Sequence, residues 1–231
     1  MQRFLILYRR WRYLLLLGSL LCLLVVEPVA SSFGITVWLF DALFAFVMVI
    51  FVLALAQDQV WRFVALFVCV PAAILSIGGH LLTPNASAMS TSIGHAIGAI
   101  FFLAVTVKIV VSIFRSQDLS VDSIFGAICG YLLLGIAWAL TYAMLYAASP
   151  DSFQLSEATL AQLERGDHDR HVFIYYSFVT LTTVGYGDVN PLSTPARTLS
   201  WLEAATGQLY LAVLITGLVG AWVTRKPPNG S

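Results

Sequence analysis

The sequence predicts an all-α integral membrane protein with six transmembrane helices. Hydrophobic residues make up 59% of the 231 residues and charged residues only 10%, whereas a soluble domain carries about 25% charged residues. Most of the chain must therefore face lipid or other protein. Apolar runs between polar turns approach or exceed the ~20 residues with which an α-helix crosses a bilayer. The predicted spans are residues 13–26, 35–56, 60–77, 93–114, 124–148 and 199–223.

The first span has an alternative interpretation as a secretory signal peptide. Four arginines come before it, namely Arg3, Arg9, Arg10 and Arg12. A basic start followed by a short apolar run is typical of such peptides. However, Glu27 and Pro28 occupy positions where cleavage near Ala30 would favour small neutral residues. We therefore expect an uncleaved span whose arginines extend to the membrane interface.

The segments between the spans are predicted from their polarity. Residues 80–92 read as a loop, and residues 149–171 are polar and mostly acidic. Within the latter segment, residues 156–164 form a predicted short helix that ends at Gly166. The apolar and aromatic residues 173–179 predict a second short helix, and the sixth span is expected to begin after Pro191 and Pro195.

A glycine-containing motif, Thr-Leu-Thr-Thr-Val-Gly-Tyr-Gly-Asp at residues 180–188, follows the second short helix. Glycine adopts positive φ angles without steric cost, so Gly185 and Gly187 allow consecutive carbonyls to point the same way. The simplest alternative is a tight turn between two helices. A longer specified motif that lies between a short apolar helix and a long one favours an ion path lined by oxygens.

Thr-Val-Gly-Tyr-Gly is the filter sequence of potassium channels, and this chain resembles the pore domain of the tetrameric potassium channel family. The resemblance is specific over residues 173–223. It implies a re-entrant pore helix and a selectivity filter between helices five and six. It also implies a pore domain at residues 118–231, preceded by a four-helix membrane domain at residues 1–117. Since the motif occurs once, four chains must form the ring, and we expect a homotetramer.

The resemblance also implies roles for the motif residues. The transported K⁺ would be bound by the carbonyls of the filter and by the Thr183 hydroxyl. The filter residues are Thr183, Val184, Gly185, Tyr186 and Gly187. The residues that would support them are Asp188, Tyr175 and Thr182, with Tyr175 placed to offer a hydroxyl to Asp188. Some bacterial members carry a buried glutamate where this chain has Val179, so this chain lacks that carboxylate behind the filter.

The sixth span carries the candidates for the inner cavity and for gating. Gly207 lies where such channels often have a hinge glycine, and a packing glycine is the alternative. Glu203 is an acid within a span, which is costly and usually faces a cavity or a partner. We place it on the same face as Leu211. The cavity-lining candidates at helical spacing are Gln208, Leu211 and Ile215.

Lysine and arginine near the span ends predict the orientation. With both termini in the cytoplasm, the inside residues are Arg3, Arg9, Arg10, Arg12, Arg62, Arg115, Arg225 and Lys226. Only Arg165, Arg170 and Arg197 then lie outside. This distribution predicts a multi-pass protein of the plasma or inner membrane whose filter opens to the exterior.

Voltage dependence is expected to be weak. Steep voltage gating needs about three to four charges per subunit, each contributing ~2.3 kcal/mol per 100 mV. Residues 93–114 contain one basic residue, Lys108, and Arg115 lies already at the inner edge. The first four spans are therefore predicted to be a scaffold or a sensor of something other than voltage.

Parts of the sequence are also compatible with other functions. A less selective cation channel is the nearest alternative, and the intact Tyr186 argues against it. A membrane redox protein could use His80 and His95 to bind a haem or metal, although loop histidines without such a role are commoner. The residues 167–171 could bind a metal or form a solvated acidic rim. No catalytic motif occurs, so we expect a non-enzyme that has no organic cofactor, binds no nucleic acid, and interacts with the lipid bilayer and K⁺.

Overall fold

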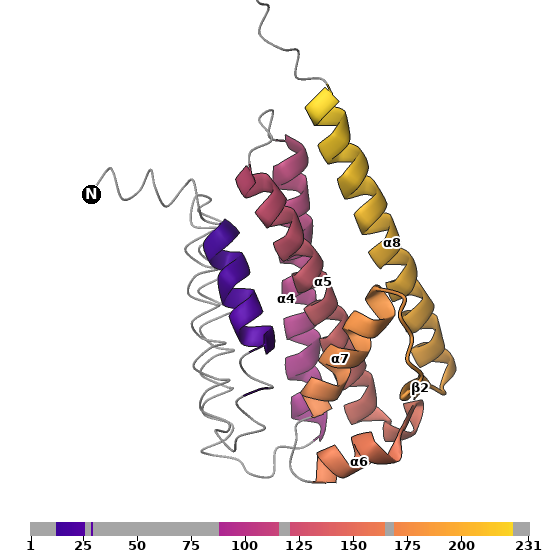
Figure 1. The fold of residues 1–231 in the computed structure, drawn as a ribbon. Coiled ribbons are helices and arrows are strands. Elements are labelled where there is room, and N and C mark those ends of the chain that lie inside the picture. The colour runs from indigo at the N-terminus through magenta and orange to yellow at the C-terminus, as the bar shows by residue number, and fades with distance from the viewer. Residues whose placement is uncertain (1–12, 26–28, 30–87, 116–120, 165–168, 224–231) are drawn as a thin grey trace, which may run out of the picture. The chain divides into compact units, whose positions relative to one another are not determined.

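The computed structural model describes residues 13–25, 29, 88–115, 121–164 and 169–223. This part of the chain is mostly helical and contains one small antiparallel sheet (Figure 1). The second and third predicted spans lie outside it. After the helix Tyr13–Val25, the elements are α4 (Ala88–Arg115), α5 (Val121–Ala148), η1 (Pro150–Ser152), β1 (Phe153–Leu155), α6 (Glu157–Glu164), α7 (Asp169–Leu181), β2 (Val189–Pro191) and α8 (Thr194–Val223).

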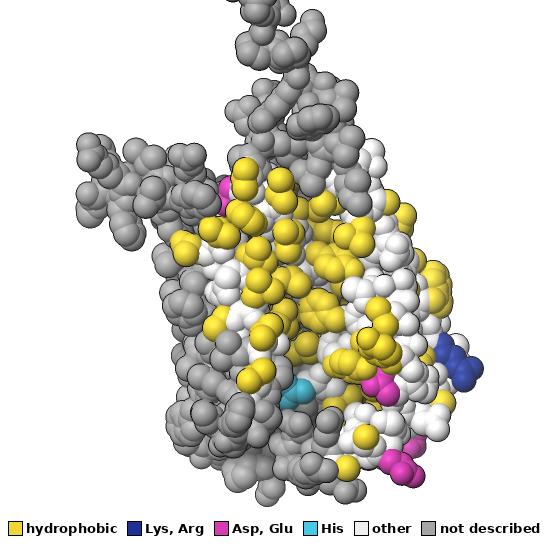
Figure 2. Space-filling view, in the orientation of Figure 1, with side chains coloured by type: hydrophobic (Ala, Val, Ile, Leu, Met, Phe, Trp, Pro, Cys, Tyr) yellow, Lys and Arg dark blue, Asp and Glu magenta, His cyan; other side chains and the backbone are white. Residues whose placement is uncertain are grey.

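The long helices contain the predicted fourth, fifth and sixth spans. Two helical segments are long and apolar enough to cross a membrane, His95–Ile113 within α4 and Val121–Ala148, which is α5. Apolar side chains cover much of the visible described face, where few charges occur (Figure 2). Ile100, for example, is 70% exposed. These features indicate a membrane protein.

Three predicted boundaries were wrong. Residues 88–92 are helical, not part of a loop, because Ala88 and Met89 favour helix. The second short helix runs over Asp169–Leu181, so it is longer than its apolar segment. α8 begins before Pro195, not after it, because proline in a first turn lacks only an N–H that would have no helical partner. The Ser193 hydroxyl accepts a hydrogen bond from the Ala196 N–H at 3.3 Å and caps this helix.

The described chain divides into two compact units, and α5 contributes to both. In the first, the helix Tyr13–Val25 contacts the beginning of α5. The Tyr13 N–H donates to Asp122 Oδ1 at 3.1 Å, and the Tyr13 ring lies against Gly126. The second unit contains α4, the remainder of α5 and all the elements that follow. The predicted division at residue 117 stays a prediction.

The sheet was not predicted and corrects the all-α expectation to a mostly helical fold. β1 pairs antiparallel with β2, so that Gln154 lies opposite Asn190. Sequence patterns did not indicate β1 or β2, because three-residue strands are too short to show an alternating apolar pattern. The predicted short helix in this segment is confirmed as α6.

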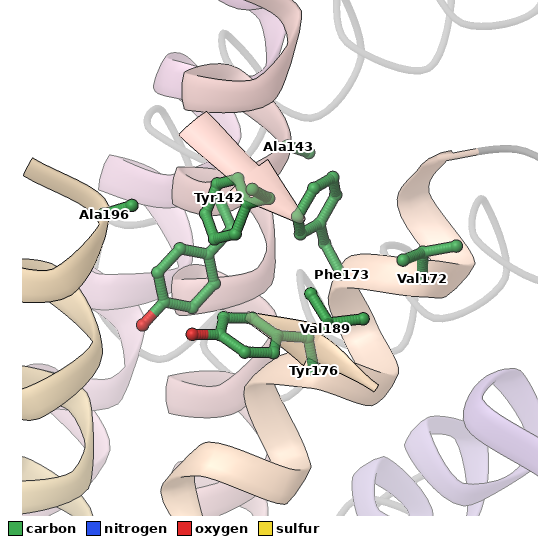
Figure 3. Packing of buried hydrophobic residues seen from close by; sticks show 8 residues of the cluster. Tyr142, Ala143, Val172, Phe173, Tyr176, Val189 and Ala196 are labelled. Atoms are coloured by element: carbon green, nitrogen blue, oxygen red, sulfur yellow. The ribbon is translucent and has the colours of Figure 1, made fainter. Parts of the chain in front are cut away.

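An aromatic cluster fills the space between α5, α7 and the sheet (Figure 3). The ring centroid of Phe153 lies 5.8 Å from that of Tyr142, 5.1 Å from that of Phe173 and 5.6 Å from that of Tyr176. The three ring pairs meet edge to face, which adds to the stabilisation from burial. The cluster thus fixes the sheet and α7 against α5.

Glycines let the helices of the second unit approach closely. A Cβ atom at Gly135 would lie 2.8 Å from the Phe178 ring, and one at Gly207 would lie 2.5 Å from the Leu181 carbonyl oxygen. The second contact involves rigid backbone at the end of α7, so it leaves no space for a side chain. Close packing therefore accounts for Gly207 in this structure, where α8 continues through it without a break.

We predict that Gly207→Ala lowers the free energy of unfolding by about 1–3 kcal/mol, the cost of overpacking. Gly18→Ala is the matched control, because a Cβ atom there would meet nothing within 4 Å. The control should be neutral or stabilising, since alanine favours helix over glycine. Thermal unfolding in detergent measures both. Equal stability of the two variants would contradict the tight contact between α8 and α7.

Candidate functional site

The backbone of the glycine motif alternates in handedness. φ is 61° at Thr183, 60° at Gly185 and 80° at Gly187, whereas Val184 and Tyr186 have no positive φ. In an extended strand, successive carbonyls point to opposite sides. When residues with positive and negative φ alternate, successive carbonyls instead point to the same side. They then form a row of dipoles that can bind an ion. The motif is therefore not a simple turn.

In this segment the first backbone N–H groups form hydrogen bonds in the described part of the chain, but most carbonyls do not. The N–H groups of Thr182, Thr183 and Val184 donate to carbonyls of the last turn of α7 at 3.1, 2.9 and 2.9 Å. Within the described residues, no donor of the chain bonds the carbonyl oxygens of residues 183–186. Four consecutive acceptors are thus available to a cation. The negative end of the α7 dipole, which also favours a cation, lies at the start of the segment.

The outer end of the motif is held by side chains. The expected contact between the Tyr175 hydroxyl and Asp188 stays a prediction. The Tyr175 and Tyr186 rings stack with centroids 6.5 Å apart. The Asn190 amide donates to the Gly187 carbonyl at 2.7 Å. Gly187 therefore differs from the four residues before it, whose carbonyls have no such partner in the part of the chain that the structure describes.

The inner end is held at the last turn of α7. The Thr182 hydroxyl donates to the Phe178 carbonyl at 2.6 Å, and its supporting role stays a prediction. The Tyr131 hydroxyl of α5 donates to the Leu181 carbonyl at 3.3 Å. Because Gly207 packs on the same carbonyl, α5 and α8 both fix the point where α7 ends.

Glu203 is the centre of a buried hydrogen-bond network behind the motif. Its side chain is fully buried. Oε2 accepts from the Tyr142 hydroxyl at 2.6 Å, and Oε1 lies 2.5 Å from the Ser177 hydroxyl. The Ser177 hydroxyl in turn donates to the Gly135 carbonyl at 2.7 Å. The network links α5, α7 and α8, and it offsets the cost of burying a carboxyl group.

The number of protons in this network determines the form of the carboxyl group. There are three short oxygen–oxygen contacts, and the Gly135 carbonyl can only accept. Tyr142 supplies one proton and Ser177 supplies another. These two protons are used in the bonds to Glu203 Oε2 and to the Gly135 carbonyl. The remaining contact, between Ser177 and Glu203, is a hydrogen bond only if the carboxyl group carries a proton. The geometry therefore favours a neutral Glu203 that donates to Ser177.

The structure corrects the expected position of Glu203. The sequence analysis placed it on the same helix face as Leu211, but Leu211 is 36% exposed in the single chain whereas Glu203 is 0% exposed. The cause is the pair of hydroxyls on α5 and α7. Tyr142 and Ser177 were missed by sequence reasoning, because a hydroxyl within an apolar helix gives no sign of its partner.

The other predicted residues are placed as follows. Gln208 is exposed on α8, and Ile215 lies within α8 although its side chain is outside the described part. Their roles in a cavity, and a hinge at Gly207, stay predictions. His95 lies in α4, whereas His80 and residues 167–168 lie outside the described residues. The redox and metal alternatives therefore remain untested.

We predict that Glu203→Ala lowers the free energy of unfolding by about 2–3 kcal/mol, because two buried hydroxyls lose their partner. Glu203→Gln should cost less than about 1 kcal/mol, since an amide reproduces the acceptor and the donor of a neutral carboxyl group. Thermal unfolding in detergent is the measurement.

Thr198→Ala is the control for these variants, because among the described residues the Thr198 hydroxyl bonds only to the Thr194 carbonyl within α8. If Glu203→Gln were as destabilising as Glu203→Ala, the proton count would be wrong and the carboxyl group would be charged.

Known proteins resemble the part of the chain that contains the motif. Residues 127–224 match the sequence profile of a family described as an ion channel. Protein LctB of Bacillus caldotenax is 29% identical over 136 residues, which cover 56% of this chain and 94% of that protein. No solved structure matches the chain. An ion channel fits the expectation that the protein is not an enzyme. Residues 127–224, which include α7, the motif and α8, are thus similar to an ion-channel domain.

Proposed function

We propose that this protein is a potassium-selective channel that conducts K⁺ passively through a homotetrameric pore. The observation that carries the proposal is the row of carbonyls at residues 183–186, which accept no hydrogen bond within the described residues. Rings of such oxygens replace the water shell of a dehydrated cation. The similarity of residues 127–224 to an ion channel supports it.

Selectivity for K⁺ rests on the motif and on its supports. The ligands are the carbonyls of residues 183–186 and the Thr183 hydroxyl, with Gly187 completing the filter. Tyr186 stacks on Tyr175, and that contact with the pore helix sets how far the strand stands from the axis. A cation channel of lower selectivity is the alternative, and it requires that this support be loose.

The geometry of ion binding supports an assembly of several chains. One strand contacts a cation from one side only, so several copies must meet at an axis. In the single chain, Tyr186 is 72% exposed and Val184 is 52% exposed. Neighbouring copies would cover these side chains. The single motif of the chain, together with the resemblance to tetrameric channels, supports four copies.

The orientation and the gating form part of the same proposal. The protein lies in the plasma or inner membrane with both termini in the cytoplasm, as the positions of lysine and arginine favour. Opening depends weakly on voltage. Within α4 the membrane-crossing segment His95–Ile113 contains one basic residue, Lys108, fewer than the three to four charges per subunit that steep gating needs.

Reversal potentials in mixed K⁺ and Na⁺ test this proposal on protein reconstituted in liposomes. We predict that Gly187→Asp abolishes the K⁺ preference or the flux, because any side chain is strained at the φ of 80° that this position adopts. Gly18→Ala, outside the pore, should keep the wild-type reversal potential. A Gly187→Asp variant with unchanged reversal potential would show that the filter assignment is wrong.

A further inference from the structure

The segment that follows the filter is tied to the segment that precedes α6. The Asp188 carbonyl accepts a hydrogen bond from the Ser156 N–H at 2.9 Å. β2 then pairs with β1, and the N–H groups of Leu192 and Ser193 donate to the Ser152 carbonyl at 2.8 and 3.3 Å. We call residues 152–156 the outer strap. It holds the exit of the filter through backbone bonds at both ends of β2.

The outer strap is itself anchored in the core. Phe153 is 5% exposed and Ser152 is 2% exposed, and the Phe153 ring packs against Tyr142 of α5 and Phe173 of α7. On the opposite face of β1, Gln154 is exposed. The position of the filter exit is therefore set by the same core that positions α7.

Ser156 belongs to both the outer strap and α6. Its hydroxyl accepts from the Thr159 N–H at 3.3 Å and caps the helix. Its carbonyl accepts from the Leu160 N–H at 2.9 Å. A helix of eight residues is marginal on its own, so α6 depends on this junction. A change at Ser156 therefore affects both the start of α6 and the hydrogen bond to the Asp188 carbonyl.

We propose that the outer strap, through Ser156 and Phe153, positions the outer end of the filter and couples α6 to the ion path. This inference rests on the proposed channel function. Carbonyls that face one another repel when no cation lies between them, so a loosely held outer end needs more external K⁺ to stay conductive. The external K⁺ concentration that sustains half of the maximal current therefore reports on the strap.

Two variants at one position isolate the backbone bond. Ser156→Ala removes the capping hydroxyl and keeps the N–H, whereas Ser156→Pro removes both. Proline is compatible with this position, because it favours an extended conformation of the preceding residue and Leu155 is already in a strand. We expect Ser156→Pro to raise the external K⁺ requirement about fivefold relative to Ser156→Ala, the ratio that one backbone hydrogen bond supplies. Equal requirements in assembled channels would overturn the proposal.

A reversible crosslink provides a second test that does not depend on the proline variant folding. Gln154 and Asn190 are opposite each other in the sheet, at a spacing of about 5.5 Å that suits a disulfide. In the variant Gln154→Cys with Asn190→Cys, oxidation should lower the K⁺ requirement and reductant should restore it. Asn190→Cys alone is the control, because it has the native cysteines and also lacks the Asn190 amide that bonds the Gly187 carbonyl. Its K⁺ requirement should not respond to oxidant or reductant.

An oxidised crosslink without effect on the K⁺ requirement would overturn the role of the strap. Wild-type protein that conducts no K⁺ would instead overturn the proposed function. The two failures are therefore distinguishable.

Discussion

Backbone carbonyls that are left without hydrogen-bond donors impose the main constraint on this fold. The carbonyls of residues 183–186 accept no hydrogen bond within the described part of the chain. Their conformation also includes Thr183 at a φ of 61°, which an L-residue adopts only at a cost. Such a segment cannot hold its own shape. The surrounding elements must hold it from both ends.

The supports come from different elements and use different interactions. At the inner end, the carbonyls of the last α7 turn accept the N–H groups of the segment, and Tyr131 and Gly207 fix that turn. Behind α7, the network of Glu203 joins three helices. At the outer end, the strap holds Asp188, and the Tyr186 ring stacks on that of Tyr175. Together these contacts leave the carbonyls of residues 183–186 free to bind a cation.

Much of the fold could be predicted from sequence because it depends on local patterns. Apolar length predicted α4, α5 and α8, and the glycine motif predicted the unusual backbone, since only glycine adopts positive φ without cost. The starts of α4 at Ala88 and of α8 at Thr194 were mispredicted. They depend on helix propensity and on a proline in the first turn, and an apolar pattern shows neither. The strap was missed because the pairing of β1 with β2 joins segments on either side of α6 and α7, and such pairing leaves no local signal. The burial of Glu203 depended on distant hydroxyls in the same way.

A structure of the full-length protein determined in Rb⁺, whose anomalous scattering marks its position, is the most direct test of the central claim. The account predicts four chains around one axis, with Rb⁺ between successive layers of carbonyl oxygens from residues 183–186. Two results would contradict it. One is a filter whose carbonyls are occupied by donors of the protein, and the other is an assembly in which these residues do not meet at an axis.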